Sequence, residues 1–306
     1  MAAEVQPLVS IVCVTYNHEK YIETAIQSFL MQKTDFPFEI CIGEDDSSDR
    51  TREICQKYAD QYPDKVRLFL RSRKDVIYYD GRPTGRYNFL ETLKAARGKY
   101  IALCEGDDFW IHPDKLQFQF NFLENNPDYT MVSHAIQIEN QDGTLVPKVM
   151  PPEFHDGSAQ LLASHGNYIP TLSAMFRKEV IVDNLDILTG LPCADFPMWL
   201  TCLEHGRIRY FPQVMGIYRN HGNGSWSSLS QYQEFKSNAF LYESLCSKFS
   251  PEVNQILQGK ACEFLAKLMH LAFHEGKQEE AKQFYDRLIK LDPRYLFQLM
   301  QFFMTN

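Results

Sequence analysis

The sequence lacks the features that mark several large classes of protein. No apolar run in its 306 residues approaches the ~20 residues that a membrane-spanning helix requires. Residues 1–7 contain no basic segment followed by an apolar one, so we expect no signal peptide. The formal charge of −8 and the absence of a basic patch leave little to attract a phosphate backbone, so we expect no nucleic-acid partner.

The eight cysteines lack the paired spacing of a zinc site or a redox dithiol. Most of them lie inside apolar runs, where free cysteine behaves as a small hydrophobic residue. Thiols kept in this form indicate a reducing compartment. We therefore expect a cytoplasmic protein, with peripheral attachment at the inner face of the membrane as the alternative.

The composition is that of a folded protein, with 44% hydrophobic and 23% charged residues. Its first hundred residues alternate short apolar, β-branched segments with segments of helical spacing. Strands are expected at residues 8–16, 38–43, 66–70 and 99–104, and helices at residues 20–30, 51–62 and 88–96. This alternation predicts a mainly parallel sheet flanked by helices.

Three polar loops follow strands of this expected sheet, at residues 15–19, 44–51 and 105–110. Because ligands of open α/β sheets bind beyond the carboxyl ends of the strands, these loops are expected to converge on one crevice. The loop at 44–51 holds four carboxylates, more than the capping of a helix requires, and we assign Asp45 to a ligand. The polar residues of the first loop could hold a base and ribose, although a plain strand end explains them equally well.

The third loop, Glu105-Gly106-Asp107-Asp108, directly follows a buried strand. Carboxylates this close repel one another unless a cation relieves them, and hard oxygen ligands suit Mg²⁺ or Mn²⁺. We therefore expect Asp107 to bind a divalent metal, with a solvated acidic turn as the alternative. Gly106 permits close approach of the backbone.

Two residues far along the chain are candidates for the same site. His221 lies in a Gly-rich loop that could fold back over the metal, although a single histidine is more often a surface or core residue. Asp195 stands among apolar and aromatic residues, where loss of hydration could raise its pKa and suit a general base. Its alternative is the N-cap of a helix with Pro197 in the first turn, and the two roles are compatible.

Aromatic residues near these loops could present flat apolar faces to a ligand, but buried aromatics usually belong to the core. The candidates are Trp110, Trp199, Tyr218 and Trp226. Among them, we assign Trp199 and Trp226 to contacts with an acceptor.

Five segments, in order and spacing, resemble the inverting family 2 glycosyltransferases of the GT-A fold. The segments are VSIVCVTYN, EDDSSDRT, GKYIALCEGDDFW, ADFPMWL and YRNHGNGSW. The resemblance covers about residues 8–228. It implies a GT-A (nucleotide-diphospho-sugar transferase) fold, with a mainly parallel central sheet flanked by helices and a C-terminal helical appendage.

The resemblance also implies roles for individual residues. The nucleotide and donor site is expected to comprise Thr15, Tyr16, Asn17, Glu19, Asp45, Arg86, Asn88, Glu105, Asp107 and Asp108, with Arg71 as an alternative to Arg86. Glu105-Gly106-Asp107 matches the metal-binding D-x-D element with glutamate in its first position. Asp195 matches the catalytic acid, although Ala194 stands where a preceding acid is frequent. Asp107 and His221 are the expected ligands of Mn²⁺ or Mg²⁺.

The domain organisation follows from the same resemblance. We expect a glycosyltransferase domain at residues 1–228, with a nucleotide-binding half at about 1–110 and an acceptor half at about 111–228. Residues 229–306 are expected to form helices that pack on this domain, and part of them resembles one tetratricopeptide helix. Residues 295–304 could instead contact a membrane surface or another subunit.

The expected activity is transfer of a hexosyl or N-acetylhexosaminyl group from a nucleotide-diphosphate donor, a UDP-sugar first, to a glycan or lipid-linked acceptor. Asp195 would act as the base in an inverting, metal-assisted displacement during polysaccharide, O-antigen or capsule assembly. The alternatives are an inactive nucleotide-sugar binding protein, a sugar nucleotidyltransferase, and a scaffold acting through its C-terminal helices. A nucleotidyltransferase should carry a Gly-rich phosphate loop after its first strand, and TYNHEK contains no glycine.

Overall fold

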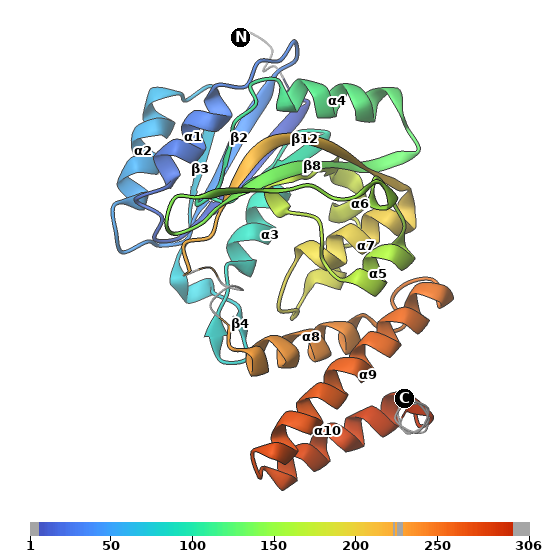
Figure 1. The fold of residues 1–306 in the computed structure, drawn as a ribbon. Helices are drawn as coiled ribbons and strands as arrows, with labels where there is room; N and C mark the ends of the chain where they lie inside the picture. The colour runs from blue at the N-terminus through green and yellow to red at the C-terminus, as the bar shows by residue number, and fades with distance from the viewer. Residues whose placement is uncertain (1–5, 223, 225–228, 296–306) are drawn as a thin grey trace.

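The structure is a computed structural model that describes residues 6–222, 224 and 229–295. A curved β-sheet with helices on both faces forms most of this part of the chain, and three helices extend from it at the C-terminal end (Figure 1). The order of strands across the main sheet is β10-β12-β8-β11-β6-β1-β2-β3, with β7 paired to β12 and β9 to β8.

The first half of the sheet is parallel, as the sequence predicts. It consists of β1 (Val9–Thr15), β2 (Phe38–Glu44), β3 (Val66–Leu70) and β6 (Tyr100–Leu103). Because successive side chains of a strand point to opposite faces, Ile11 and Val12 enter different hydrophobic clusters. Both clusters are apolar, which explains why these strands read as continuous hydrophobic runs.

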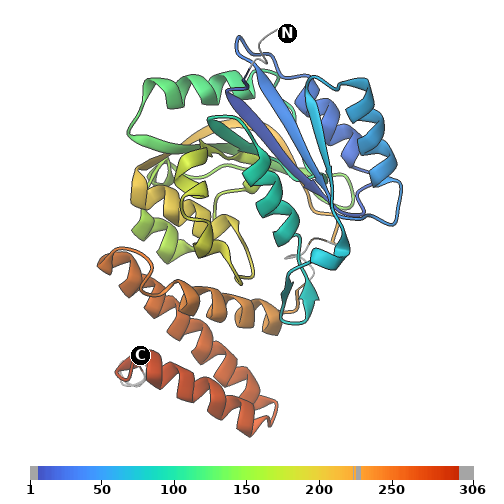
Figure 2. The same cartoon turned by 180° about the vertical axis from the view of Figure 1, so that it is seen from behind.

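Helices cover the two faces of the sheet (Figure 2). One face packs against α1 (Ile22–Leu30), α2 (Thr51–Gln61) and α4 (Lys115–Asn125). The other packs against α3 (Arg86–Ala95), α5 (Ala159–His165), α6 (Lys178–Val182) and α7 (Asp195–His205). The helix and strand positions expected between residues 8 and 104 are confirmed to within about two residues.

The second half of the sheet is mixed, and no regular alternation of strands and helices in the sequence indicates it. Its long strands are β8 (Tyr129–Glu139) and β12 (Arg207–Arg219), which run parallel to each other. Shorter strands join them: β7 (Phe109–Trp110), β9 (Leu145–Lys148), β10 (Asp156–Gly157) and β11 (Met175–Arg177). A hairpin at Asp142-Gly143 connects β8 to β9, and Gly143 takes a positive φ of 80° there. The register of β12 shifts between Phe211 and Val214, so no clean alternation was available to predict it.

The C-terminal helices are α8 (Gln231–Leu245), α9 (Pro251–His274) and α10 (Gln278–Leu291). Leu241 and Tyr242 of α8 and Val253 of α9 belong to the same hydrophobic cluster as α7, and the ring of Tyr242 lies 5.4 Å from that of Phe196. The distal half of α9 packs with α10 in a cluster of its own. No helix among the described residues is long and apolar enough to cross a membrane. Residues 296–304 of the segment considered for surface contact lie outside the described residues.

A small hairpin, β4 (Tyr78–Tyr79) and β5 (Arg82–Pro83), stands between β3 and α3 and was not predicted. It lies beside α8 in Figure 1. Lys236 of α8 donates a hydrogen bond of 2.8 Å to Asp80, and the rings of Tyr79 and Phe240 lie 5.5 Å apart. The first of the C-terminal helices is thus attached to the α/β part both through its core and through this hairpin.

Candidate functional site

Three loops meet at the carboxyl ends of β1, β2 and β6. Backbone hydrogen bonds join them, from Gly106 N to Val14 O at 3.0 Å and from Asp45 N to Thr15 O at 3.1 Å. A methyl group added to Gly106 would lie 2.6 Å from Thr15 Oγ1, so only glycine fits there. The crevice expected from the order of strands and loops is therefore present.

Side chains of the first loop hold the second loop in place. Asn17 adopts a positive φ of 55°, and its Oδ1 accepts a 2.9 Å hydrogen bond from Ser48 N. Glu19 accepts one of 3.1 Å from Arg50 N. The polar groups of Asn17 and Glu19 thus bind protein in this structure, while their expected contacts with a nucleotide stay predictions. Thr15 is buried, and its hydroxyl has no hydrogen-bond partner among the described residues.

Asp45 is buried at the base of this pair of loops. Its Oδ2 accepts a 2.6 Å hydrogen bond from Arg73 Nη1, and the guanidinium lies 4.2 Å from the ring centre of Tyr16. Burial raises the pKa of Asp45, although the charge of Arg73 opposes the shift. Arg73 was not expected from the sequence. Its position a few residues past the carboxyl end of β3 could have identified it as a candidate site residue.

The acidic loop is attached to a distant part of the chain. Strand β7, which directly follows the loop, pairs antiparallel with β12 through Trp110 and Gly216. This pairing brings Arg219, at the end of β12, to the acids. Its backbone N–H donates to Asp108 Oδ1 at 2.9 Å, and its Nη1 donates to the carbonyl oxygen of Asp107 at 2.9 Å.

The three carboxylates of this loop differ in their electrostatic environment. Burial, followed by the charge of Asp107, raises the pKa of Glu105 to about 8. Burial and the two neighbouring acids raise that of Asp108 well above its usual value. Burial also opposes the ionisation of Asp107, but hydrogen bonding to His221 and the charge of His18 outweigh it, so its pKa is lowered. Asp107 is thus the acid of the loop that is held ionised.

Two imidazoles approach Asp107. Nε2 of His221 lies 3.0 Å from Asp107 Oδ2, and Nε2 of His18 lies 3.7 Å from the same atom. Burial lowers the pKa of His18, whereas the hydrogen bond to Asp107 raises that of His221. The sequence analysis named His221 and missed His18, although His18 directly follows Asn17 in the first loop.

The donor atoms around Asp107 fit a divalent cation only in part. Carboxylate oxygen suits Mg²⁺ and Mn²⁺, and imidazole is a common metal ligand. Within the described ranges, however, no group of three or more His, Cys, Asp or Glu residues is arranged to hold a metal. Asp107 and His221 therefore supply at most part of a coordination shell, and a bound ligand would have to supply the rest.

Asp195 begins α7 and is half-buried. Its Oδ2 accepts a 2.5 Å hydrogen bond from Asn167 Nδ2, and its Oδ1 accepts one of 2.9 Å from Phe196 N. Asp195 lines a cleft of about 960 Å³ together with Glu105 and Asp107. Segments that are far apart in sequence thus share one cavity, as the sequence analysis expected.

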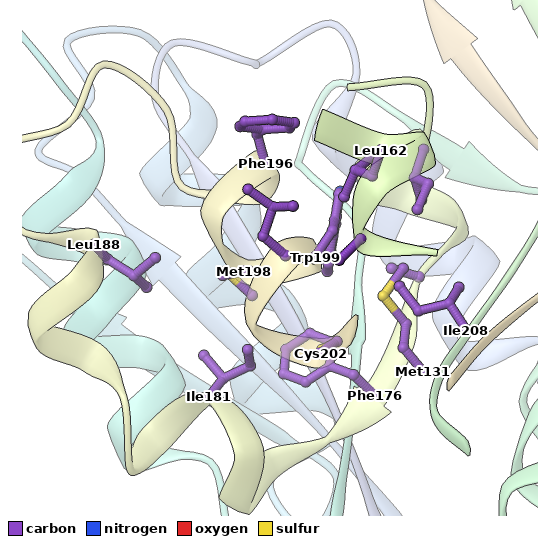
Figure 3. Close-up of a cluster of buried hydrophobic side chains, with 14 of the residues drawn as sticks. Met131, Leu162, Phe176, Ile181, Leu188, Phe196, Met198, Trp199, Cys202 and Ile208 are labelled. Carbon is purple, nitrogen blue, oxygen red and sulfur yellow. The ribbon is translucent and has the colours of Figure 1, made fainter. Parts of the chain in front are cut away.

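Two expected contacts are wrong for this structure. Trp199 of α7 is fully buried in the hydrophobic cluster that Figure 3 shows, with its ring 6.1 Å from that of Phe176, and offers no face to an acceptor. Asn88 is 1% exposed, and its Nδ2 donates a 2.8 Å hydrogen bond to the carbonyl oxygen of Gly43. Asn88 therefore supports the end of β2 from below and does not face the cleft. In both cases helical packing decides the direction of the side chain.

Arg86 and Trp226 are two further candidates for the site. Arg86 lines the cleft, and its Nη2 donates a hydrogen bond to the carbonyl oxygen of Leu191. Trp226, the second expected acceptor contact, lies outside the described residues. The sequence analysis did not anticipate that α8 would contribute to the wall of the cleft through Ser237, Asn238 and Leu241.

Comparison of the sequence with known proteins gives relatives in carbohydrate assembly. An uncharacterised protein of Mycobacterium tuberculosis is 35% identical over 220 residues, which cover 72% of this chain and 60% of that protein. The chain therefore spans less than two thirds of that relative. The putative teichuronic acid biosynthesis glycosyltransferase TuaG of Bacillus subtilis is 27% identical over 246 residues, covering 78% of this chain and 89% of TuaG.

Comparison of the structure gives the same class of protein. S. aureus TarS 1-349 in complex with UDP-GlcNAc matches with a TM-score of 0.65 and 19% identity, over 94% of this chain and 82% of that one. The mannosyltransferase PcManGT from Pyrobaculum calidifontis, in complex with GDP-Man and Mn²⁺, matches with a TM-score of 0.59 and 18% identity, over 97% of this chain and 84% of that one. These similarities confirm the GT-A fold.

The family itself is shown by the sequence. The model of Glycosyl transferase family 2 matches residues 10–183, which include the three loops at the strand ends and the acids that line the cleft from 105 to 108. More than half of the chain is matched in this way. The chain therefore belongs to glycosyl transferase family 2.

Proposed function

We propose that this glycosyltransferase moves a hexosyl or N-acetylhexosaminyl group from a UDP-sugar to a hydroxyl group of a glycan or lipid-linked acceptor, with inversion at the anomeric carbon. The observation that carries the proposal is the cleft that Asp195 lines together with Glu105 and Asp107 of the acidic loop. The teichuronic acid relative and the UDP-GlcNAc complex of a structural neighbour support a role in polysaccharide, O-antigen or capsule assembly.

Asp195 is the general base of the proposed reaction. Asn167 Nδ2 and the N–H of Phe196 each donate a hydrogen bond to one of its carboxylate oxygens. Hydrogen bonds of this kind fix the orientation of the carboxylate and leave further lone pairs for a substrate. In the proposed reaction, Asp195 accepts the proton of the acceptor hydroxyl as its oxygen attacks the anomeric carbon, and the nucleoside diphosphate leaves from the opposite side.

The donor would lie on the other side of the cleft. We place its base between the loops that carry Tyr16 and Asp45, and its diphosphate beside Asp107. Asp107 and His221 would hold the divalent cation, which when bound neutralises negative charge on the departing diphosphate. Glu105 would lie nearer the ribose, and Asp108 supports the loop through its bond to Arg219.

A thermal-shift screen of nucleoside diphosphates and nucleotide sugars with Mn²⁺ tests the proposal without an acceptor. A ligand that binds the folded state stabilises it by mass action. We expect UDP and one UDP-sugar to raise the melting temperature, and Asp107→Ala to abolish the effect. If no nucleotide stabilises the protein, the proposed donor is wrong. Binding without transfer in any acceptor assay would favour an inactive nucleotide-sugar binding protein.

A further inference from the structure

Arg86 is a buried cation that forms no ion pair with a carboxylate in the described part of the chain. It lies in the first turn of α3 and is 7% exposed. Nη2 donates a 3.2 Å hydrogen bond to the carbonyl oxygen of Leu191. Among the described residues Nη1 has no hydrogen-bond partner, and no carboxylate forms an ion pair with the guanidinium.

Burial of the Arg86 guanidinium without an ion pair is unfavourable unless another interaction compensates for its charge. A buried charge costs free energy unless it is paired, and an unpaired guanidinium donor adds to that cost. Arg86 carries a charge that stays on at any physiological pH, because the guanidinium does not lose its proton in proteins. The charge is therefore available for an anion that enters the cleft.

The location of Arg86 indicates which substrate supplies the anion. The guanidinium is bonded to Leu191, in the segment that leads directly to Asp195, and both Arg86 and Asp195 line the cleft. Burial lowers the pKa of Arg86, and the charge of Asp195 opposes this shift. Arg86 thus lies near the general base.

A second arginine lines the same cleft. Arg82, on β5, has no ion pair with a carboxylate in the described part of the chain. The hairpin that carries Arg82 is held against α8 by Lys236 and Asp80, at 2.8 Å. The position of Arg82 is therefore set by tertiary contacts of its hairpin and not by a neighbouring acid.

We propose that the cleft binds an oxyanion of the acceptor, a phosphate or a carboxylate, with Arg86 as its principal contact and Arg82 as a second one. The planar guanidinium fork matches the geometry of both oxyanions. This inference rests on the proposed function, because it presumes that Asp195 faces an acceptor. It adds that the acceptor is negatively charged close to the hydroxyl group that receives the sugar.

Binding of small anions to the full chain, saturated with UDP and Mg²⁺ so that the donor site is filled, tests the inference. The probes are glucose 1-phosphate for a phosphate, glucuronate for a carboxylate, and glucose as the neutral control. We expect at least one anion, but not glucose, to raise the melting temperature by about 2 °C or more at millimolar concentration. Arg86→Gln should abolish this shift and change the affinity for UDP by less than about threefold. Arg294→Gln, which removes an exposed arginine, is the matched control and should retain it.

The outcomes separate this inference from the function on which it rests. Failure of the wild type to bind UDP contradicts the proposed function, whereas UDP binding without any anion shift contradicts only the acceptor oxyanion. Loss of UDP affinity by more than about tenfold in Arg86→Gln would overturn the inference, because Arg86 would then serve the donor. If circular dichroism shows that this variant does not fold, Arg86→Lys and Arg82→Gln replace it. We expect both to weaken anion binding, and unchanged binding in both would overturn the inference.

Discussion

Nε2 of His221 lies 3.0 Å from Oδ2 of Asp107, although the two residues are 114 positions apart in the sequence. The pairing of β7 with β12 produces this contact, because it places the end of β12 directly beside the acidic loop. The hydrogen bond has an electrostatic consequence for both partners: it raises the pKa of His221 and helps to lower that of Asp107. Metal binding and the integrity of this strand pair should therefore depend on each other.

His221→Ala should raise the Mn²⁺ concentration needed for half-maximal UDP binding by at least about tenfold, because one ligand of the metal is lost. Metal binding should also weaken as the pH falls through the raised pKa of His221, since a protonated imidazole cannot ligate. Titration of UDP binding with Mn²⁺ at several pH values measures both effects. His274→Ala, an exposed histidine of α9, is the control.

Treatment with EDTA should abolish hydrolysis of the donor sugar, and Mn²⁺ or Mg²⁺ should restore it. Hydrolysis assays before and after exhaustive chelation measure this. The reason is that the ionised Asp107 repels the diphosphate in the absence of a cation. Unchanged hydrolysis after chelation would rule out the divalent metal.

Asp195→Asn should lower turnover by at least ~10²-fold, the low end for removal of a general base, and leave donor binding intact. The amide keeps the shape of the carboxylate but cannot take a proton from the acceptor. Steady-state kinetics together with UDP titration measure the two quantities separately. Near-normal turnover in the purified variant would contradict the assignment of Asp195.

Trp199→Ala should lower the free energy of unfolding by about 3–5 kcal/mol, because the ring is fully buried and its removal leaves a cavity. Trp199→Phe should cost less, since it keeps much of the ring and removes an indole N–H that has no partner among the described residues. Urea unfolding measures both. A raised acceptor KM with unchanged stability would instead support the acceptor contact first expected for Trp199.

Because Lys115 is buried, the free energy of unfolding should rise with pH above neutrality. Its side chain is fully buried, and burial lowers the pKa of its amine to about 7. Between this value and the usual value of 10.5, the unfolded chain binds more protons than the folded one, so the free energy of unfolding increases with pH. Below pH 7 both states are protonated, and the folded state carries the full cost of the buried charge.

In the Lys115→Met variant, the free energy of unfolding should increase by about 2 kcal/mol less between pH 7 and pH 9 than in the wild type. The reason is that one pKa unit corresponds to about 1.4 kcal/mol. Urea unfolding of the wild type and the variant at both pH values measures the difference. Lys57→Met, which removes an exposed lysine, should leave the slope unchanged. Equal slopes for wild type and Lys115→Met would show that Lys115 does not titrate in this range.

Local patterns in the sequence determined the first half of the fold and the acidic end of the site. The runs around Ile11 and Ile40 are buried on both faces of a parallel sheet, and such strands have a composition that can be read without tertiary information. The loop at Asp107 was identified because clustered carboxylates after a buried strand need a compensating charge. The segment at Asp195 was identified from its resemblance to the family.

Tertiary structure alone decided which of the remaining candidates face the cleft. Trp199 and Asn88 lie within four residues of candidate site residues in the sequence. Helix geometry nevertheless directs both side chains into the packed interior. His18 and Arg73 reach their partners across loops, so their roles depend on distances that no local pattern encodes. The same is true of Arg86, whose significance is the absence of an acidic partner among the described residues. Whether a charge is paired depends on which strands and helices meet, and that is settled only when the whole chain packs.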